Sequence, residues 1–354
     1  MKMKVLGVAA FTASLALPVF ASDTISFDAD GTGGANGDVV IGAFDWAAGS
    51  TLAEDSVPTA VDDSFDVYSH GTLIGFLDAG GDPAGSPTGL NTAGSGFEIT
   101  FISGFTETIT SQSSVVAAYD VGADLAVGGG DDVITVDTTI TLEDASTQNV
   151  NFFKIYYDDL SDGSGLKSSS LLGTGYNDGL LILDASVGVI SGNFTSTLQF
   201  IDVDSSGDFS AGDTVITVDL DQSGNGDDWS GQQTVQGEGA TALEADAFYQ
   251  DDDFFKDDIS SLLADLFFNT SNVLPFQETN PSMSFDDGSG GTLAPSLGDI
   301  NGLTGPDILF QTDANNSFVK TVSVPEPGSM FLLGLGLLTL GMTRRRRASE
   351  LSEA

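Results

Sequence analysis

The sequence predicts an all-β protein, built as an antiparallel β-sandwich, and three observations support this fold class. Apolar and polar residues alternate with a period of two along much of the chain, which is typical of strands that bury one face. Gly and Asp, which favour turns, are abundant: 44 of the 354 residues are Gly. No regular succession of strand and helix segments is present, which argues against a parallel α/β sheet.

The alternation defines four expected strands. In each of them, apolar side chains occupy one face and Thr, Asp, Glu or Gln side chains occupy the other. Turns rich in Gly, Asp and Ser separate these segments, as in antiparallel sandwiches. The expected strands are centred on residues 97–101, 134–142, 194–200 and 216–220.

One segment departs from this pattern. Between Ile259 and Phe267, large apolar residues recur at i, i+3, i+4, i+7 and i+8, which is the spacing of one helix face. Asp257 and Asp258 precede the segment as plausible cap and dipole partners. The sequence therefore predicts one short helix packed on the sheet.

The region between the two ends of the chain, residues 22–324, is longer than a typical domain. One large sandwich or two abutting sandwiches would both account for its length. No segment within it has the length of a linker, so we expect one continuous β region.

The chain is strongly acidic, and its charge argues against one class of partner. It has 52 Asp and Glu residues against 10 Lys and Arg, a net charge of −42. Of the acidic residues, 42 are Asp, which favours turns and the ligation of hard cations. Residues 22–324 hold 49 of the acidic residues and four of the basic ones, a net charge of −45. Nucleic acid is therefore not an expected partner, since phosphate binding needs basic patches.

The N-terminus has the three parts of a secretory signal peptide. Lys2 and Lys4 precede an apolar run that extends to Val19, and the small residue Ala21 follows. A membrane-spanning helix is the alternative, but the run is short and contains Pro18. We expect a signal peptide over residues 1–21, cleaved after Ala21.

The C-terminus has a second short apolar run. Val324–Ser329 reads Val-Pro-Glu-Pro-Gly-Ser, Met330–Met342 is apolar, and four consecutive Arg follow. Thirteen helical residues span roughly 20 Å, whereas a bilayer core is about 30 Å thick. A stop-transfer anchor with cytoplasmic Arg residues is one interpretation of this tail.

The order of these features resembles the PEP-CTERM sorting signal, which would cover residues 325–354 and include a short sorting helix. The resemblance implies a Gram-negative bacterium, transient insertion into the inner membrane and recognition of the Pro-Glu-Pro region by an exosortase. It also implies removal of the tail and delivery to the cell surface or extracellular matrix. The expected sorting residues are Pro325, Glu326, Pro327, Arg344, Arg345, Arg346 and Arg347.

The strongest internal motif is the segment Asp202–Asp213, which has the spacing of a 12-residue calcium loop. It resembles the loops of EF-hand and dockerin modules. Asp at position 12 is shorter than the usual Glu, and the flanking residues look like strands rather than helices. An Asp-rich β-turn is the alternative interpretation. The expected Ca²⁺ ligands are Asp202, Asp204, Ser206, Asp208 through its carbonyl, Ser210 and Asp213.

Three further segments match calcium motifs more weakly. Residues 219–230 begin with a similar spacing but lack an acidic residue at position 12. Residues 28–38 place three Asp in a Gly-rich stretch, and residues 128–132 look like one turn of a calcium β-roll. A single such turn has little force, because a roll needs stacked repeats.

Three other stretches, residues 151–158, 173–183 and 305–315, look like a PEP-CTERM subgroup that includes flocculation-associated proteins. This resemblance implies matrix, biofilm or floc assembly alongside exopolysaccharide, without enzymatic activity. We therefore expect an exported, non-enzymatic matrix protein whose contacts depend on divalent cations.

Two other functions remain open from the sequence. A carbohydrate-binding module could use Trp46 or Trp229 to stack on sugars, and a polysaccharide hydrolase or lyase could use a carboxylate pair. The absence of Cys excludes a disulfide framework, a zinc–thiolate site and a Cys nucleophile. His70 has no serine elbow or zinc-ligand spacing near it, so we expect it on the surface or in a turn.

Overall fold

The computed structural model describes residues 24–32, 38–57, 60–123, 125, 127–161, 167–216, 218–219, 233–270 and 282–321. The regular elements formed by these residues are all β-strands, and none is a helix, which confirms the all-β prediction. The expected signal peptide and sorting segment lie outside the described residues. Within the described part of the chain, no helix has the length and apolar character needed to span a membrane.

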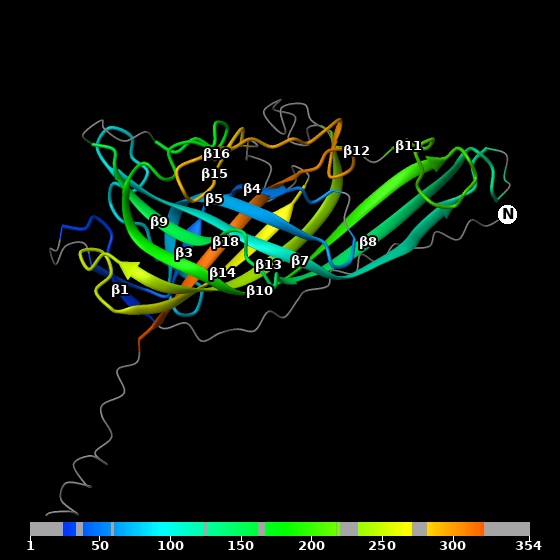
Figure 1. Ribbon diagram of the computed structural model, residues 1–354. Helices are drawn as coiled ribbons and strands as arrows, with labels where there is room; N and C mark the ends of the chain where they lie inside the picture. The colour runs from blue at the N-terminus through cyan, green and yellow to red at the C-terminus, as the bar shows by residue number, and fades with distance from the viewer. Residues whose placement is uncertain are drawn as a thin grey trace, which may run out of the picture. The chain divides into compact units, whose positions relative to one another are not determined.

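Most strands belong to one large, mainly antiparallel sheet of 14 strands (Figure 1). Its long strands follow the order β10-β8-β7-β5-β3-β18-β14-β13, and β10 also pairs with β13, so the sheet closes on itself. Additional pairs join β4 to β5 and β18, and β9 to β7 and β10. These strands are β3 (Ala43–Trp46), β4 (Gly49–Glu54), β5 (Ser64–Leu77), β7 (Phe97–Asp120), β8 (Asp132–Asp144), β9 (Asn151–Asp159), β10 (Leu180–Asp202), β13 (Gln233–Gln250), β14 (Ile259–Asn269) and β18 (Ile308–Lys320).

Short strands complete the fold. Two separate two-stranded sheets pair β1 with β2 and β15 with β16, and the other short strands extend the large sheet. The short strands are β1 (Ile25–Asp28), β2 (Asp38–Ile41), β6 (Pro83–Gly85), β11 (Thr214–Val215), β12 (Val218–Asp219), β15 (Phe285–Asp286), β16 (Thr292–Leu293) and β17 (Ile300–Asn301).

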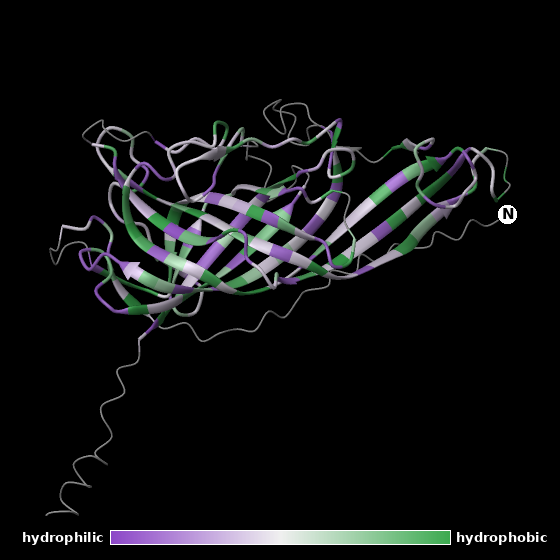
Figure 2. Cartoon of the chain, in the orientation of Figure 1, coloured by the Kyte–Doolittle hydropathy of each residue, from purple (hydrophilic) through white to green (hydrophobic). Residues whose placement is uncertain are grey.

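The closed sheet encloses an aromatic core. Hydropathy alternates along the long strands in Figure 2, as the period-two pattern predicts. The rings of Phe27 and Phe44 meet edge to face at 5.0 Å, and those of Phe101 and Phe153 stack at 5.3 Å. All four side chains are at most 1% exposed. Much of the chain's Phe content is thus used to fill one core.

The prediction of a short helix over residues 259–267 is wrong, because this segment is strand β14. β14 pairs with β13 on one side and β18 on the other. Leu262, Ala264 and Leu266 are buried at every second position, as in a strand with one inward face. The spacing of the apolar residues is compatible with a helix and with a strand. The segment forms a strand because neighbouring strands pair with it on both edges.

Three strands run on together past the rest of the sheet, which Figure 1 shows at the right of the molecule. We call this extension the arm. β5 stops pairing with β7 at Thr108, whereas β8 pairs with β7 as far as Asp120. The arm consists of residues 110–120 of β7, 132–141 of β8 and 192–202 of β10, and β13 still pairs with β10 as far as Thr197.

Candidate metal site at the tip of the arm

The predicted calcium loop lies at the tip of the arm, between β10 and β11. These strands form a hairpin in which Phe200 pairs with Val215 and Ile201 with Thr214. The hairpin brings the two ends of the loop together. Ser205 and Gly207 have φ angles of 60° and 81°, so the chain turns sharply in the first half of the loop.

Three of the predicted ligands converge in space. Asp202, Asp204 and Asp213 each offer a carboxylate oxygen, and these oxygens all lie within 4.8 Å of one another. They occupy positions 1, 3 and 12 of the predicted loop. Asp202 is 1% exposed, Asp213 is half-buried and Asp204 is exposed. The group therefore has a buried base and an open side.

Backbone amides of the loop hold the buried carboxylate in place. Asp202 Oδ1 accepts a hydrogen bond from the Ser206 amide at 3.0 Å, and Oδ2 accepts one from the Gly207 amide at 2.8 Å. Such bonds orient the carboxylate before any cation arrives.

The last carboxylate closes the loop in the same manner. Asp213 Oδ1 accepts from the Val203 amide at 2.9 Å, and Oδ2 accepts from the Ser210 amide at 2.6 Å. The first of these bonds joins residues ten apart in the chain, and the second joins residues three apart. The loop thus has an ordered conformation built from its own side chains.

The exposed carboxylate, Asp204, is stabilised in its charged form. Hydrogen bonds from Ser206 and Ser210 lower the pKa of Asp204 below its ordinary value. Ser210 Oγ donates to Asp204 Oδ2 at 3.0 Å. Ser206 Oγ donates to the Asp208 carbonyl, the expected ligand at position 7, at 2.8 Å. All six predicted ligands therefore belong to one hydrogen-bonded loop.

An aromatic contact fixes the loop to the arm. The Phe209 ring meets the Phe200 ring edge to face at 5.3 Å, and Phe200 is fully buried. Phe209 stands at position 8 of the loop.

A second aspartate lies beside the loop. Asp132 is directly opposite Asp202 in the β8–β10 ladder, and it is 0% exposed. Its carboxylate accepts hydrogen bonds from the Tyr119 hydroxyl and from the Gly128 and Gly129 amides at 2.7 and 3.1 Å. The Tyr119 bond is the largest cause that lowers the pKa of Asp132. In the segment predicted as a β-roll turn, Asp132 therefore ties a loop together, and its place beside Asp202 could not be read from local spacing.

The other weak matches do not form comparable groups among the described residues. Asp28 and Asp38 are opposite each other on β1 and β2, and Asp28 lies 3.9 Å from the Lys256 ammonium. Only the first residue of segment 219–230 is described.

His70 is buried, so its expected place on the surface or in a turn is wrong. It lies in β5 between the rings of Tyr176 at 4.0 Å and Phe285 at 4.8 Å. Burial lowers the pKa of His70 to about 3, so the ring is neutral. Its Nε2 lies 2.6 Å from Ser282 Oγ, which itself donates to the Ser170 carbonyl. Because the hydroxyl has one proton, Nε2 is the donor and is not placed to act as a base towards Ser282.

Trp46 is also a core residue. It is 1% exposed, its ring meets that of Phe101 at 4.8 Å, and its Nε1 donates to Asn316 Oδ1 at 2.8 Å. It has no free face for a sugar ring, so the stacking role considered for Trp46 is wrong. Trp229 lies outside the described residues.

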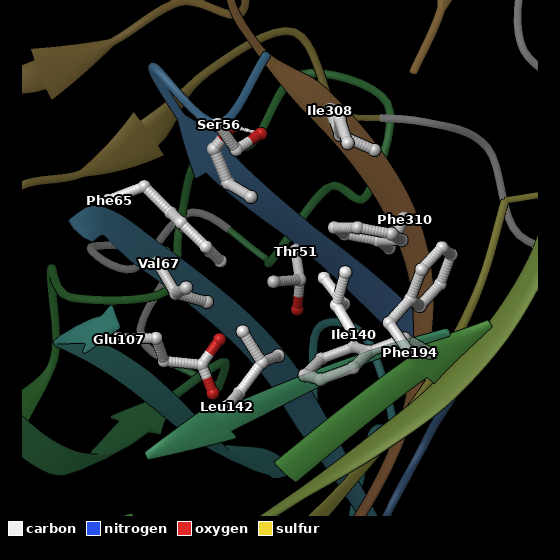
Figure 3. A pocket seen from close by; sticks show the side chains of 12 residues that line it. Thr51, Ser56, Phe65, Val67, Glu107, Ile140, Leu142, Phe194, Ile308 and Phe310 are labelled. Atoms are coloured by element: carbon white, nitrogen blue, oxygen red, sulfur yellow. Dashed lines mark hydrogen bonds between the residues drawn. The ribbon is translucent and has the colours of Figure 1, made fainter. Parts of the chain in front are cut away.

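The sequence did not point to Glu107, which faces an apolar cavity of about 40 Å³ (Figure 3). Glu107 is 2% exposed, and Thr241 Oγ1 donates to its Oε1 at 2.8 Å. Burial raises the pKa of Glu107 to about 7. A polar residue at an inward position of a strand was the available signal. Among the described residues that line the cavity it is the one carboxylate, so the arrangement lacks the pair that glycoside hydrolysis uses.

Comparison with known proteins identifies the family of one segment of the chain. Residues 323–347 match the family described as the PEP-CTERM protein-sorting motif. The match includes all seven predicted sorting residues, Pro325–Pro327 and Arg344–Arg347, and confirms the resemblance of the C-terminal tail. No curated protein and no solved structure matches the chain.

Proposed function

We propose that this chain, which carries a PEP-CTERM sorting motif and is therefore an exosortase-processed extracellular protein, is a non-enzymatic matrix protein that supports cell aggregation. It would act with exopolysaccharide in floc or biofilm formation, after transient insertion into the inner membrane of a Gram-negative cell. Its contacts would depend on Ca²⁺ bound at the tip of the arm.

The observation that carries this proposal is the convergence of Asp202, Asp204 and Asp213. Ca²⁺ prefers six to eight oxygen ligands, including carboxylates and backbone carbonyls. The same loop adds the Asp208 carbonyl and the hydroxyls of Ser206 and Ser210, so oxygen donors of the right kind are present. The open side of the loop leaves room for water or a partner's oxygen.

Electrostatics supplies the reason for a cation. Asp132 and Asp202 are opposite each other on neighbouring strands, where like charges are unfavourable. At larger scale, residues 22–324 carry a net charge of −45 and would repel both a second copy of the chain and an anionic polysaccharide. A divalent cation in the loop would reduce both repulsions and could bridge the protein to a polysaccharide carboxylate.

The geometry gives less support to the alternatives. A carbohydrate-binding module loses Trp46 as a stacking surface, because that ring is buried. A hydrolase or lyase would need a pair of carboxylates around a cleft, and the cavity at Glu107 offers a single one among its described residues. Loss of glycan binding on Trp229→Ala would nevertheless favour a carbohydrate-binding module.

The test is aggregation of cells that produce the protein. Wild-type cells should aggregate in Ca²⁺ and disperse in EDTA. A double variant, Asp202→Asn with Asp213→Asn, should disperse in both, because two of the three converging charges are gone. Asp144→Asn with Asp252→Asn removes the same charge at exposed positions outside the loop and should behave as wild type. Equal aggregation of wild-type cells in Ca²⁺ and EDTA would contradict the proposal.

A further inference from the structure

The outer edge of the arm is a long strand edge without a partner strand among the described residues. β8 pairs with one side of β7 as far as Asp120. On the same side, β9 pairs with β7 before β8, as far as Phe105. On the other side, β5 stops at Thr108, and the backbone of Asp62 and Asp63 then bonds Ile109. All side chains from Thr110 to Asp120 are exposed. The outward backbone N–H and C=O groups of this stretch are therefore available to another strand.

This edge lacks the side chains that usually protect a strand edge against pairing. Soluble proteins blunt exposed edges with Lys, Pro or inward charges. Residues 97–153 contain no Lys, Arg or Pro, and residues 108–119 contain no charged residue. Val115 and Val116, which favour strands, are 64% and 55% exposed. Such a stretch in a chain of net charge −42 is unusual and points to contact with another protein surface.

Two β-bulges set the length of the available edge. They lie between Ile109 and Ser111 and between Val116 and Ala118. A bulge bends the strand and interrupts the ladder, so it ends regular pairing. Between the two bulges, Ser111–Val116 remains as six regular residues.

We propose that Ser111–Val116 pairs antiparallel with the same segment of a second copy of this chain. An antiparallel strand edge is complementary to itself about a twofold axis, since each outward N–H meets an outward C=O of the copy. The pairing would join two arms into one sheet. It deepens the proposed function, on which it rests for its role, by naming the protein partner in aggregation.

The low charge of this edge favours a second copy as its partner. Along β7, the nearest carboxylates are Glu107 and Asp120, each four residues outside Ser111–Val116, or roughly 14 Å at about 3.4 Å per residue. That separation exceeds the Debye length of about 8 Å at physiological ionic strength. On β8, Asp137 is opposite Val115, but its carboxylate accepts a hydrogen bond from Thr197 on the far strand at 2.7 Å. Asp62 and Asp63 bond the backbone of Ile109 just before this segment, but Ser111–Val116 itself contains no charged residue. Repulsion between copies is therefore low along the segment.

The exported protein tests the pairing directly, because its lack of Cys allows a single spin label at each position of Ser111–Val116. For a twofold pair, the distance between the two labels should pass through a minimum within the segment. It should grow by about 7 Å for each residue away from the axis, twice the rise of a strand. Absence of any label-to-label distance, or a profile without a minimum, would overturn the inference.

A charge variant separates edge pairing from other association. Ser113→Glu with Ser114→Glu places like charges across the paired strands and should raise the dissociation constant of the dimer about tenfold in sedimentation equilibrium. Thr139→Glu is the control, since Thr139 is exposed and opposite Ser113 on β8, one strand further from the edge. Equal thermal midpoints would show that all three proteins are folded. A wild-type monomer at every concentration, or a dimer unchanged by the Glu pair, would contradict the proposal.

Failure of this inference can be distinguished from failure of the proposed function. The double variant Asp202→Asn with Asp213→Asn should still form the dimer, because the tip loop takes no part in the edge. Equal aggregation of wild-type cells in Ca²⁺ and EDTA, with an intact dimer, would count against the metal site alone. A monomeric protein that still aggregates cells in Ca²⁺ would count against the edge pairing alone.

Discussion

Asp202 and Glu107 show how the same functional group takes different roles at the residue scale. Asp202 accepts two backbone amide bonds and shares its loop with two further carboxylates. Glu107 accepts a single hydroxyl bond beside an apolar cavity, and burial raises its pKa to about 7. Spacing within twelve residues was sufficient to place Asp202 in one loop with Asp204 and Asp213. The environment of Glu107 depends on strands far apart in sequence, so the one local signal, a polar residue at an inward strand position, could not reveal the cavity or the Thr241 contact.

Glu107 should make stability depend on pH. Its folded pKa of about 7 is raised from 4.5, so the folded state binds the proton more tightly. The contribution of Glu107 to the free energy of unfolding should therefore fall as pH rises from about 4.5 to 7 and then level off, whereas that of buried His70, whose pKa is lowered to about 3, has the opposite sign below about pH 6.5. The shift corresponds to about 3 kcal/mol at the order of magnitude.

Glu107→Gln keeps a hydrogen-bond acceptor for Thr241 and should remove the loss of stability that the ionisation of Glu107 causes. Urea unfolding at pH 5 and pH 8 measures the effect, with Glu143→Gln as an exposed control of the same chemistry. If wild type and Glu107→Gln lose equal stability over this range, Glu107 is not the responsible group.

At the element scale, β14 shows where sequence patterns stop being decisive. Period-two alternation correctly located strands within β7, β8 and β10, because those segments alternate over many residues. In β14 the apolar pairs Leu262-Leu263 and Leu266-Phe267 gave a helical spacing, and small Ala264 concealed the inward face. Closure of the sheet by the β10–β13 pair is a matter of long-range register, which no local pattern determines.

Two Leu→Ala substitutions distinguish the strand from a helix. Leu266 is 0% exposed and faces the core, so Leu266→Ala should lower the free energy of unfolding by about 2–5 kcal/mol. Leu263 is half-buried on the other face of β14, and Leu263→Ala should cost clearly less. In a helix both residues would lie on the buried face, so equal losses in urea unfolding would contradict the strand assignment.

At the scale of the whole molecule, the distribution of charge connects the fold to its proposed role. The composition located the acidic excess in residues 22–324 but could not show which carboxylates converge. The structure gathers Asp202, Asp204 and Asp213 at the tip of an arm whose outer edge is uncharged. The arm therefore combines a candidate cation site with a candidate pairing edge, while the closed sheet provides the core that supports both.

Ca²⁺ binding by the exported protein tests the central claim most directly. Calorimetric titration should show Ca²⁺ bound at the loop, lost in Asp202→Asn with Asp213→Asn and kept in Asp144→Asn with Asp252→Asn. At about 100 times the dissociation constant, Ca²⁺ should stabilise the fold by about 2.7 kcal/mol. That gain corresponds to a rise in thermal midpoint of about 5 °C. No heat of binding and an identical midpoint in Ca²⁺ and EDTA would contradict the account.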